Sequence, residues 1–482
     1  MSDRVHHLAI VGGGVAGAST AVQAVRRSPV PLRVTLFEPR AELGRGLAYR
    51  TTDPDHRINA HLVFHPIDPT DIGQVMRWLQ ADDLLARDPE ALCAFGVFPR
   101  RAEFGRYLHE SVQAHMTANP SGSTIIHDRR MVRDLHEQGG RVRIETDDGA
   151  SLEADAVVVA IGNPPPRVPP LLAPVAGHRA CVSDPLAERA LDTLDPDAAV
   201  LVMGTSLTAA DTLASLIRRG HRGPITAFSR RGLRPRAQRP PDPSIRVEDL
   251  TDDWLLGMMM RPMADFLLPP DGGAPTLRFL IRALRQRIRE TAAQGQAWQL
   301  AFDDLRDAVW RFWPRMADAE KRRFIRRVRV WYDVHRFRIP PQTQALLDRA
   351  QADGRLRFAR YGLEAVSSAG SERLRVSLAG RDGRLEAEVG ALINCTGLDM
   401  AAAPAPGSLA ANWLADGRLQ PHPCGFGYRF DDDCRPVAAD GGVPGRIRFV
   451  GPVTVGHFGD PLGAIFIVMQ IHRMLPGLLG KL

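Results

Sequence analysis

This chain of 482 residues contains few cysteines and almost no lysine. Its five cysteines are scattered and form no C-x-x-C pair, which excludes a zinc knuckle or redox dithiol of that spacing and disfavours a disulfide reductase. Lysine occurs only at Lys321 and Lys481, so arginine carries nearly all of the positive charge behind the formal net charge of +7. Because this skew is typical of a biased base composition in the source genome, the charge indicates little about partners, and we expect no nucleic-acid partner.

Long apolar runs are also missing, and none approaches the length of a membrane span. The first ten residues already have the pattern of a buried strand, which leaves no room for a signal peptide. Hydrophobic residues make up 44% and charged residues 24%, as in ordinary globular enzymes. We therefore expect a cytoplasmic protein of two to four domains with no membrane partner, and the oligomeric state stays open.

A glycine-rich turn near the N-terminus is the most informative motif. Gly12, Gly14 and Gly17 follow an apolar strand with the spacing G-x-G-x-x-G, Ala16 lies within the turn, and a second strand ends at Glu38. In such a turn, backbone amides and the positive end of a helix approach a pyrophosphate, and the acidic residue about 20 positions on accepts a ribose hydroxyl. The motif predicts a dinucleotide site. The alternative is a glycine-rich turn without a ligand.

The same unit occurs a second time. Another buried-strand pattern covers 198–203, and it is followed by a turn that begins at Gly204 and by a helical stretch at 212–219. Each opening is followed later by an alternating meander and a short apolar strand that ends at a glycine, Gly162 in the first copy and Gly397 in the second. A repeated supersecondary unit is more specific than either motif alone, so we expect an α/β fold with two Rossmann-like domains.

The second copy is longer because it carries additional residues between about 250 and 340. Apolar residues recur there at spacings of three and four, which predicts helices over 277–292, 298–313 and 319–337. The apolar face expected for the last helix consists of Phe324, Val328, Trp331 and His335. The alternative is that the arginines of this segment recruit an anionic substrate or nucleic acid.

The chain resembles flavoproteins with two dinucleotide-binding domains, and among them the bacterial FAD/NAD(P)-binding proteins related to class B flavin monooxygenases and N-hydroxylases. The motifs that carry the resemblance cover most of the chain: 12–17, 43–49 with 58–59, 99–101 with 104–108, 204–208, 229–232, 395–397 and 449–452. The resemblance implies a glutathione-reductase-like plan. Residues 1–165 and 398–482 would form the FAD-binding domain, 170–250 and 341–397 the NAD(P)H-binding domain, and 251–340 a helical insert.

The same resemblance assigns the cofactor-binding residues. For FAD they are Gly12, Gly14, Ala16, Gly17, Glu38, Arg45, Gly46, Asn59, Gly162, Gly451 and Asp460; for NADPH they are Gly204, Ser206, Leu207, Thr208, Arg230, Arg231 and Gly397.

The charges of the two units agree with this division. Glu38 would repel a 2'-phosphate, whereas Arg230 and Arg231 occupy the corresponding place in the second unit and would suit the 2'-phosphate of NADPH. Alternatively, these arginines face solvent on a loop. The second turn departs from the pattern because Ala209 and Ala210 stand where its third glycine is expected, which weakens the match.

The C-terminal segment supplies further candidates. In flavoproteins of similar plan, a carboxylate before the last helix contacts the ribityl chain, and the positive end of that helix faces the pyrimidine edge of the flavin. Asp460 takes that place, or it simply caps the final helix. The catalytic candidates are His457 first, and then Asn59 and His61; each of the histidines can equally be a structural hydrogen-bonding group. We expect no metal site.

These features together predict an NADPH-dependent FAD monooxygenase that uses oxygen and a flavin hydroperoxide to oxygenate a small metabolite. The F-x-G-x-x-x-H-x-x-x-W signature of Baeyer–Villiger enzymes is missing, so attack on a nitrogen or another soft nucleophile is favoured over ketone oxygenation. The element at 160–163 only approximates the A-T-G-Y element of N-hydroxylases. The alternatives are an FAD-dependent NAD(P)H oxidoreductase without oxygen insertion and a non-catalytic nucleotide-binding regulatory protein.

Overall fold

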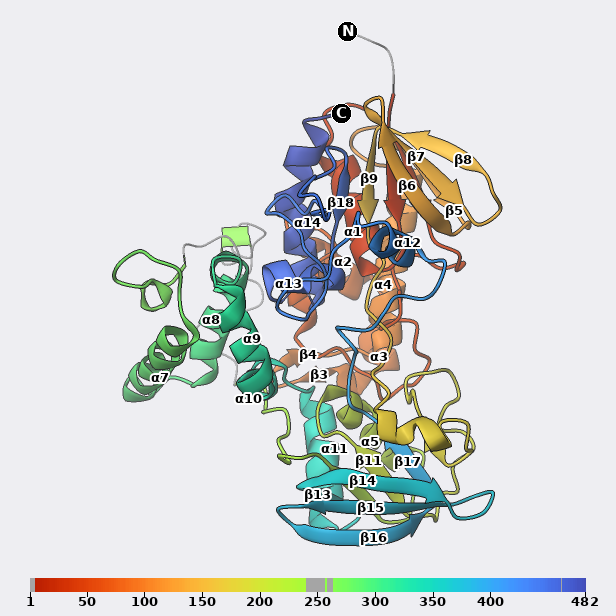
Figure 1. Ribbon diagram of the computed structural model, residues 1–482, viewed down its shortest axis with the longest axis vertical. Helices are drawn as coiled ribbons and strands as arrows, with labels where there is room; N and C mark the ends of the chain where they lie inside the picture. The colour runs from red at the N-terminus through yellow and green to blue at the C-terminus, as the bar shows by residue number, and fades with distance from the viewer. Residues whose placement is uncertain (1–4, 240–255, 258–262, 461) are drawn as a thin grey trace.

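Two five-stranded parallel sheets form the framework of the molecule (Figure 1). The computed structural model describes residues 5–239, 256–257, 263–460 and 462–482. The parts of the predicted segments 170–250 and 251–340 that fall within 240–255 and 258–262 lie outside the described residues.

The first sheet has the strand order β18-β9-β1-β2-β5, and all neighbours are parallel. Its strands are β1 (His6–Val11), β2 (Leu32–Phe37), β5 (Thr124–Asp128), β9 (Ala156–Val159) and β18 (Ile447–Phe449). Because β18 comes from the C-terminal part of the chain, the last residues return to complete the first sheet.

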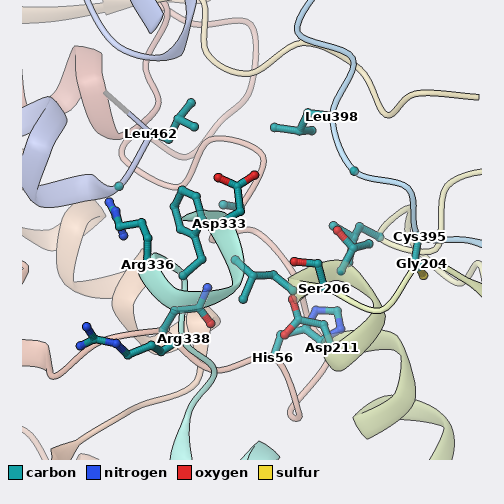
Figure 2. Close-up of a pocket in the computed structure, with 18 of the residues that line it drawn as sticks. His56, Gly204, Ser206, Asp211, Asp333, Arg336, Arg338, Cys395, Leu398 and Leu462 are labelled. Carbon is teal, nitrogen blue, oxygen red and sulfur yellow. The ribbon is translucent and has the colours of Figure 1, made fainter. Parts of the chain in front are cut away.

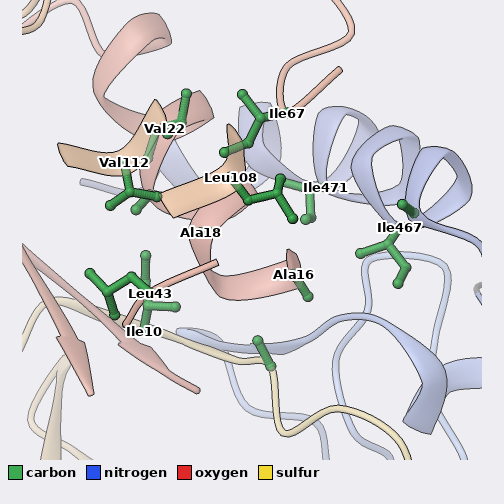
Figure 3. Close-up of a cluster of buried hydrophobic side chains, with 14 of the residues drawn as sticks. Ile10, Ala16, Ala18, Val22, Leu43, Ile67, Leu108, Val112, Ile467 and Ile471 are labelled. Atoms are coloured by element: carbon green, nitrogen blue, oxygen red, sulfur yellow. The ribbon is translucent and has the colours of Figure 1, made fainter. Parts of the chain in front are cut away.

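Helices and a small sheet cover opposite faces of this sheet. On one face, α1 (Val15–Arg27) packs against α4 (Arg101–Thr117) and α14 (Ala464–Leu479), and Ile10 of β1 lies in their common core (Figure 3). On the other face, Ala9 and Val11 pack against a core that includes residues of α12 (Leu409–Ala415) and of the antiparallel sheet β6 (Val132–Gln138), β7 (Arg141–Thr146) and β8 (Ser151–Ala154). Because both faces of the sheet are covered, the last four residues of β1, residues 8–11, are all apolar.

The second sheet repeats this plan with the order β10-β17-β11-β12-β13. Its strands are β10 (Cys181–Val182), β11 (Val200–Met203), β12 (Ile225–Phe228), β13 (Leu356–Ala359) and β17 (Ala391–Asn394). One face packs against α5 (Leu207–Arg218) and α11 (Pro341–Ala352), the other against the meander β14 (Tyr361–Ser368), β15 (Leu374–Gly380) and β16 (Gly383–Val389). The predicted α/β fold with two Rossmann-like sheets and a helical region is confirmed.

The helical region contains α7 (Leu277–Ala293), α8 (Gln299–Phe312), α9 (Asp318–Arg327) and α10 (Arg329–Arg336). The prediction of one continuous helix over 319–337 is wrong, because the helix ends at Arg327 and a new one begins at Arg329. Because of this break, the residues of the predicted apolar face do not all pack inward. Phe324 and His335 still pack against aromatic rings, but Trp331 is 47% exposed.

The short elements α2 (Gly73–Ala81), α3 (Leu84–Arg87), β3 (Leu92–Cys93) and β4 (Gly96–Val97) are among those that lie between β2 and α4 in the sequence. A further short helix, α13 (Val455–Phe458), precedes α14. Within the described parts of the chain, no helix combines the length and apolarity needed to cross a bilayer.

Candidate functional site

A cavity of about 2440 Å³ lies where the two sheet domains and the helical insert meet. Its lining includes residues within 47–65 and 93–101 of the first unit, 203–211, 228–239 and 395–397 of the second, 300–338 of the insert, and 462–466 near the C-terminus. Figure 2 shows α10, with Asp333 and Arg336, on one side of this cavity and α5, with Ser206 and Asp211, on the other.

The first glycine turn has the geometry of a backbone cradle. Gly12 has φ +100°, and a Cβ there would lie 2.3 Å from the carbonyl oxygen of Ala160. A Cβ on Gly17 would lie 1.8 Å from the carbonyl oxygen of Gly12, so the helix can approach the strand only without a side chain. Gly14 faces the Cα of Gly46, which leaves bare backbone on both sides. These residues fit the pyrophosphate of a dinucleotide.

Glu38 lies beside the cradle at the end of β2. Its buried carboxylate accepts hydrogen bonds from the backbone amides of Gly13 (3.0 Å) and Arg40 (3.2 Å). These bonds fix the side chain against the turn, where a carboxylate suits ribose hydroxyls.

The remaining FAD candidates surround the same turn. Gly451 has φ +85°, and a Cβ there would lie 3.6 Å from the Cβ of Ala16; its amide donates to Gln470 Oε1 (2.8 Å). Arg45 pairs with Glu42 (3.0 Å), and its buried Nε lacks a hydrogen-bond partner among the described residues. Gly162 follows β9 with φ +80°, and a Cβ there would meet no atom of the described residues within 4 Å, so its surroundings are open.

The second turn is tight in the same way. Gly204 has φ +124°, and a Cβ there would lie 2.1 Å from the carbonyl oxygen of Cys395. Ser206 is the N-cap residue of α5, and Leu207 and Thr208 of its first turn line the cavity. Ala209, which replaces the third glycine, is fully packed in the core.

The remaining NADPH candidates lie at the rim of the cavity. Arg230 and Arg231 follow β12, are exposed, and line the cavity, as does Gly397. Neither arginine takes part in an ion pair within the described portion of the chain, so both guanidinium groups can receive an anion.

Contacts that the sequence did not reveal hold α5 against the first unit. Asp211 pairs with Arg101 (2.8 Å), and the hydroxyl of Ser215 donates to Asp53 Oδ2 (2.7 Å). Arg218 also pairs with the buried Asp55 (2.8 Å), although burial raises the pKa of that carboxyl to about 6. These bonds help to fix the second turn relative to the first.

Two of the three predicted catalytic residues line the cavity. Burial lowers the pKa of His61 to about 4, so its ring is neutral at neutral pH. Because its Nδ1 accepts a hydrogen bond from the amide of Val63 (3.1 Å), the proton lies on Nε2, and the ring is a donor and not a base. Asn59 has a buried Oδ1 without a partner among the described residues.

The structure does not bring His457 together with these residues. His457 is not among the residues that line the cavity, and its Nε2 lies 2.8 Å from Oδ1 of Asp432, whose side chain is 89% exposed. Burial lowers the pKa of His457, so its ring forms a hydrogen bond to this exposed carboxylate outside the cavity.

Asp460 does not cap the final helix, because the N-cap residue of α14 is Gly463 and no side chain caps it. Its buried carboxylate accepts a hydrogen bond from Arg336 Nε (2.6 Å), and burial raises its pKa. The other oxygen, Oδ1, has no partner among the described residues, and Asp460 is not among the residues that line the cavity. Arg336 lies 124 positions away in sequence, and no local pattern indicated this pair.

The helical insert also packs directly on the segment before α14. The indole of Trp313 donates to the carbonyl of Gly456 (2.9 Å), and a Cβ on Gly459 would lie 2.8 Å from Trp313 Cγ. Removal of the whole insert would uncover this segment, so single substitutions are the cleaner way to separate substrate binding from cofactor binding.

Asp333 is the carboxylate of α10 that lines the cavity. Its side chain is 27% exposed, and Arg329 Nε lies 3.2 Å from Oδ2. Burial nevertheless raises the pKa of Asp333 to about 6. Within the residues that the structure describes, no group of three or more His, Cys, Asp or Glu side chains could hold a metal ion.

Comparison with protein-family models gives two matches. Residues 9–164 match the FAD-NAD(P)-binding model, and residues 90–242 match the model of L-lysine 6-monooxygenase/L-ornithine 5-monooxygenase. The search of curated proteins finds no match.

Several solved structures share the fold over the full chain. The L-lysine 6-monooxygenase of Pseudomonas syringae is 16% identical, with a TM-score of 0.61 and coverage of 99% of this chain and 100% of that one. The ornithine N-hydroxylase of Kutzneria sp. 744 is 18% identical, with a TM-score of 0.59 and coverage of 98% and 99%. The reduced ornithine hydroxylase of Pseudomonas aeruginosa is 16% identical, with a TM-score of 0.59 and coverage of 99% and 100%.

The resemblance inferred from the sequence motifs is thus confirmed by the two family models and by the shared fold. The chain is therefore similar to FAD/NAD(P)-binding flavoproteins over residues 9–164 and to the lysine and ornithine monooxygenases over residues 90–242.

Proposed function

We propose that this protein is an NADPH-dependent FAD monooxygenase that hydroxylates an amine nitrogen of a small metabolite in the cytoplasm. The observation that carries the proposal is the cavity, because residues of both dinucleotide units and of the helical insert line it together. The match of residues 90–242 to the lysine/ornithine monooxygenase model supports nitrogen as the atom attacked. The Kutzneria relative was solved with reduced FAD, NADP+ and L-ornithine.

The residues fit the two cofactors in different ways. Gly12, Gly14 and Gly46 would hold the pyrophosphate of FAD, and Glu38 its adenosine ribose. When bound, the flavin accepts a hydride from NADPH and, once reduced, activates oxygen for transfer to a nucleophile.

NADPH would bind at the second turn. The N-terminus of α5 at Ser206 would receive its phosphates, and Arg230 and Arg231 its 2'-phosphate.

The protein's own part in the reaction is to bind and orient the amine. Asp333 offers the cavity a carboxylate that is ionised above about pH 6, which would attract a protonated amine. His61 would donate a hydrogen bond through Nε2, and Asn59 would accept one at Oδ1. The insert that carries Asp333 would set substrate choice.

The test is oxygen and NADPH accounting with lysine, ornithine and cadaverine as probes. The proposal expects one of these amines to stimulate consumption of NADPH and oxygen and to yield a hydroxylamine in equal amount. Asp333→Asn should raise the KM for that amine and change kcat much less. NADPH oxidation that yields only peroxide with every amine would reject the proposal and favour an oxidoreductase without oxygen insertion.

A further inference from the structure

The excess positive charge of this chain is concentrated in the helical insert. From Leu277 at the start of α7 to Arg336 at the end of α10 there are 15 of the 62 lysines and arginines but only seven of the 55 aspartates and glutamates, which leaves the rest of the chain with 47 and 48. A bias in base composition acts on the whole chain, so it explains the preference for arginine over lysine. It does not explain why the positive charge is unbalanced only in these helices.

Four of these arginines form a row on the outer face of α7: Arg278, Arg282, Arg285 and Arg289. Their spacings of four, three and four place them on one side of the helix over a length of about 16 Å. All four side chains are exposed, and none forms an ion pair within the described part of the chain. The opposite side of α7 is its buried side, with Leu277, Leu280, Ala283 and Thr291. Figure 1 shows α7 at the outer edge of the helical region, away from both sheets.

The arginine row is not neutralised within the protein. Like charges three and four residues apart destabilise a helix. Arg287, which lies on the inner side of α7, pairs with Asp304 of α8 (3.1 Å). Glu290 is the acidic residue of α7, and it accepts a hydrogen bond from Gln286 Nε2 (2.9 Å). The row thus combines repulsion inside one helix with a surface that is complementary to negative charge.

The surroundings of the row favour an acidic helix as its partner. Ile281 and Ile288, seven residues apart, flank the row and are half-buried. All residues of α7 are described, and none of its large apolar side chains is exposed. The helix therefore offers neither an apolar face that inserts into a bilayer nor an exposed ring on which bases stack. Carboxylates spaced by four, three and four on a second helix would oppose all four guanidinium groups, with apolar side chains packed on the two isoleucines.

We propose that the outer face of α7 is a docking surface for a protein partner that presents an acidic helix. This surface is separate from both dinucleotide units, and the inference does not rest on the proposed function. It lies one helix away from the cavity, because Asp304, the partner of Arg287, is a residue of the cavity lining. A protein docked on α7 would therefore be held against the insert that also carries Asp333.

The test measures binding of a fluorescent helical peptide to the FAD-loaded protein by anisotropy. The matched peptide carries four glutamates at spacings of four, three and four with leucines beside them, and the control peptide has the same composition in shuffled order. We expect the matched peptide to bind at least about fivefold more tightly than the shuffled peptide, and to bind more weakly as the salt concentration rises.

Two variants that lose the same charge identify the surface. The row variant combines Arg278→Gln, Arg282→Gln, Arg285→Gln and Arg289→Gln, and it should bind the matched peptide about 10- to 100-fold more weakly. The control variant removes four arginines that form exposed ion pairs in the second domain: Arg179→Gln, Arg222→Gln, Arg375→Gln and Arg384→Gln. It should bind the peptide within about twofold of the wild type, because the row is intact.

The stability of the row variant gives a second readout. Its free energy of unfolding in urea should equal or exceed that of the wild type, because repulsion within α7 is removed. A lower free energy would overturn the inference, since the arginines would then serve folding. NADPH oxidation by the row variant should match the wild type, so this inference and the proposed function fail independently.

Equal binding of the matched and shuffled peptides, or equal loss of binding in both variants, would also overturn the inference. So would binding of oligothymidylate, or of phosphatidylcholine vesicles that contain phosphatidylglycerol, that is tighter than peptide binding and is lost only in the row variant. The surface would then bind a nucleic acid or a membrane instead of an acidic protein.

Discussion

Replacement of both Arg230 and Arg231 by alanine should weaken NADPH binding much more than NADH binding. The two guanidinium groups lie at the rim of the cavity after β12, and neither has an ion-pair partner among the residues described. NADPH and NADH differ only in the 2'-phosphate, so the ratio of their KM values isolates the contribution of these side chains.

The exposure of both arginines sets the expected size of the effect. An exposed ion pair contributes about 0.2–1 kcal/mol, and a charge-assisted hydrogen bond about 1.5–3 kcal/mol. Because both arginines lie at the rim of the cavity, we expect each to contribute a binding free energy between these limits, about 0.7–1.4 kcal/mol. The double substitution should therefore raise the KM for NADPH about 10- to 100-fold and leave that for NADH within about twofold.

Steady-state NADPH and NADH oxidation at fixed ionic strength measures both constants. Arg222→Ala is the matched control, because this arginine is an exposed residue of the same domain that pairs with Asp197 and does not line the cavity. An equal rise in KM for both nucleotides would refute the assignment, since arginines that read the 2'-phosphate cannot weaken NADH to the same degree.

Three further substitutions probe the cradle, the cavity and the core. Gly17→Ala should abolish flavin retention, because its Cβ would lie 1.8 Å from the carbonyl oxygen of Gly12; a full flavin absorbance per chain would contradict the cradle geometry. The KM for the amine should rise as the pH falls through about 6, because protonation removes the Asp333 charge, and a pH profile of Asp333→Asn should lack that rise. Ile471→Ala, at a fully buried position between α14 and α1, should lower the free energy of unfolding by about 2–5 kcal/mol in urea titrations, and a change below about 1 kcal/mol would contradict the packing.

Local patterns were sufficient to predict the two dinucleotide units. Gly12, Gly17 and Gly204 each lie where a side chain would collide with backbone. The tight turns therefore require glycine at these positions, and the spacing of the glycines predicts the turns. The return of the C-terminal residues to the first sheet was also expected, because the resemblance places 398–482 in the same domain as 1–165.

Features that depend on distant parts of the chain could not be predicted in this way. The Arg336–Asp460 pair joins residues 124 positions apart, and the bonds of Asp53 and Arg101 to α5 cross between domains. The break at Val328 was missed because the apolar spacing continues through it, although the helix does not. His457 was placed near the flavin by its sequence neighbours alone, and its ring instead contacts Asp432.

Anaerobic mixing of the FAD-loaded protein with NADPH is the most direct test of the central claim, that the two units hold an electron donor and a flavin that react with each other. We predict that the visible absorbance of the flavin bleaches in a single turnover without added substrate, and faster with NADPH than with NADH. A preparation that binds FAD but stays yellow with both nucleotides, or one that takes up no FAD, would contradict it.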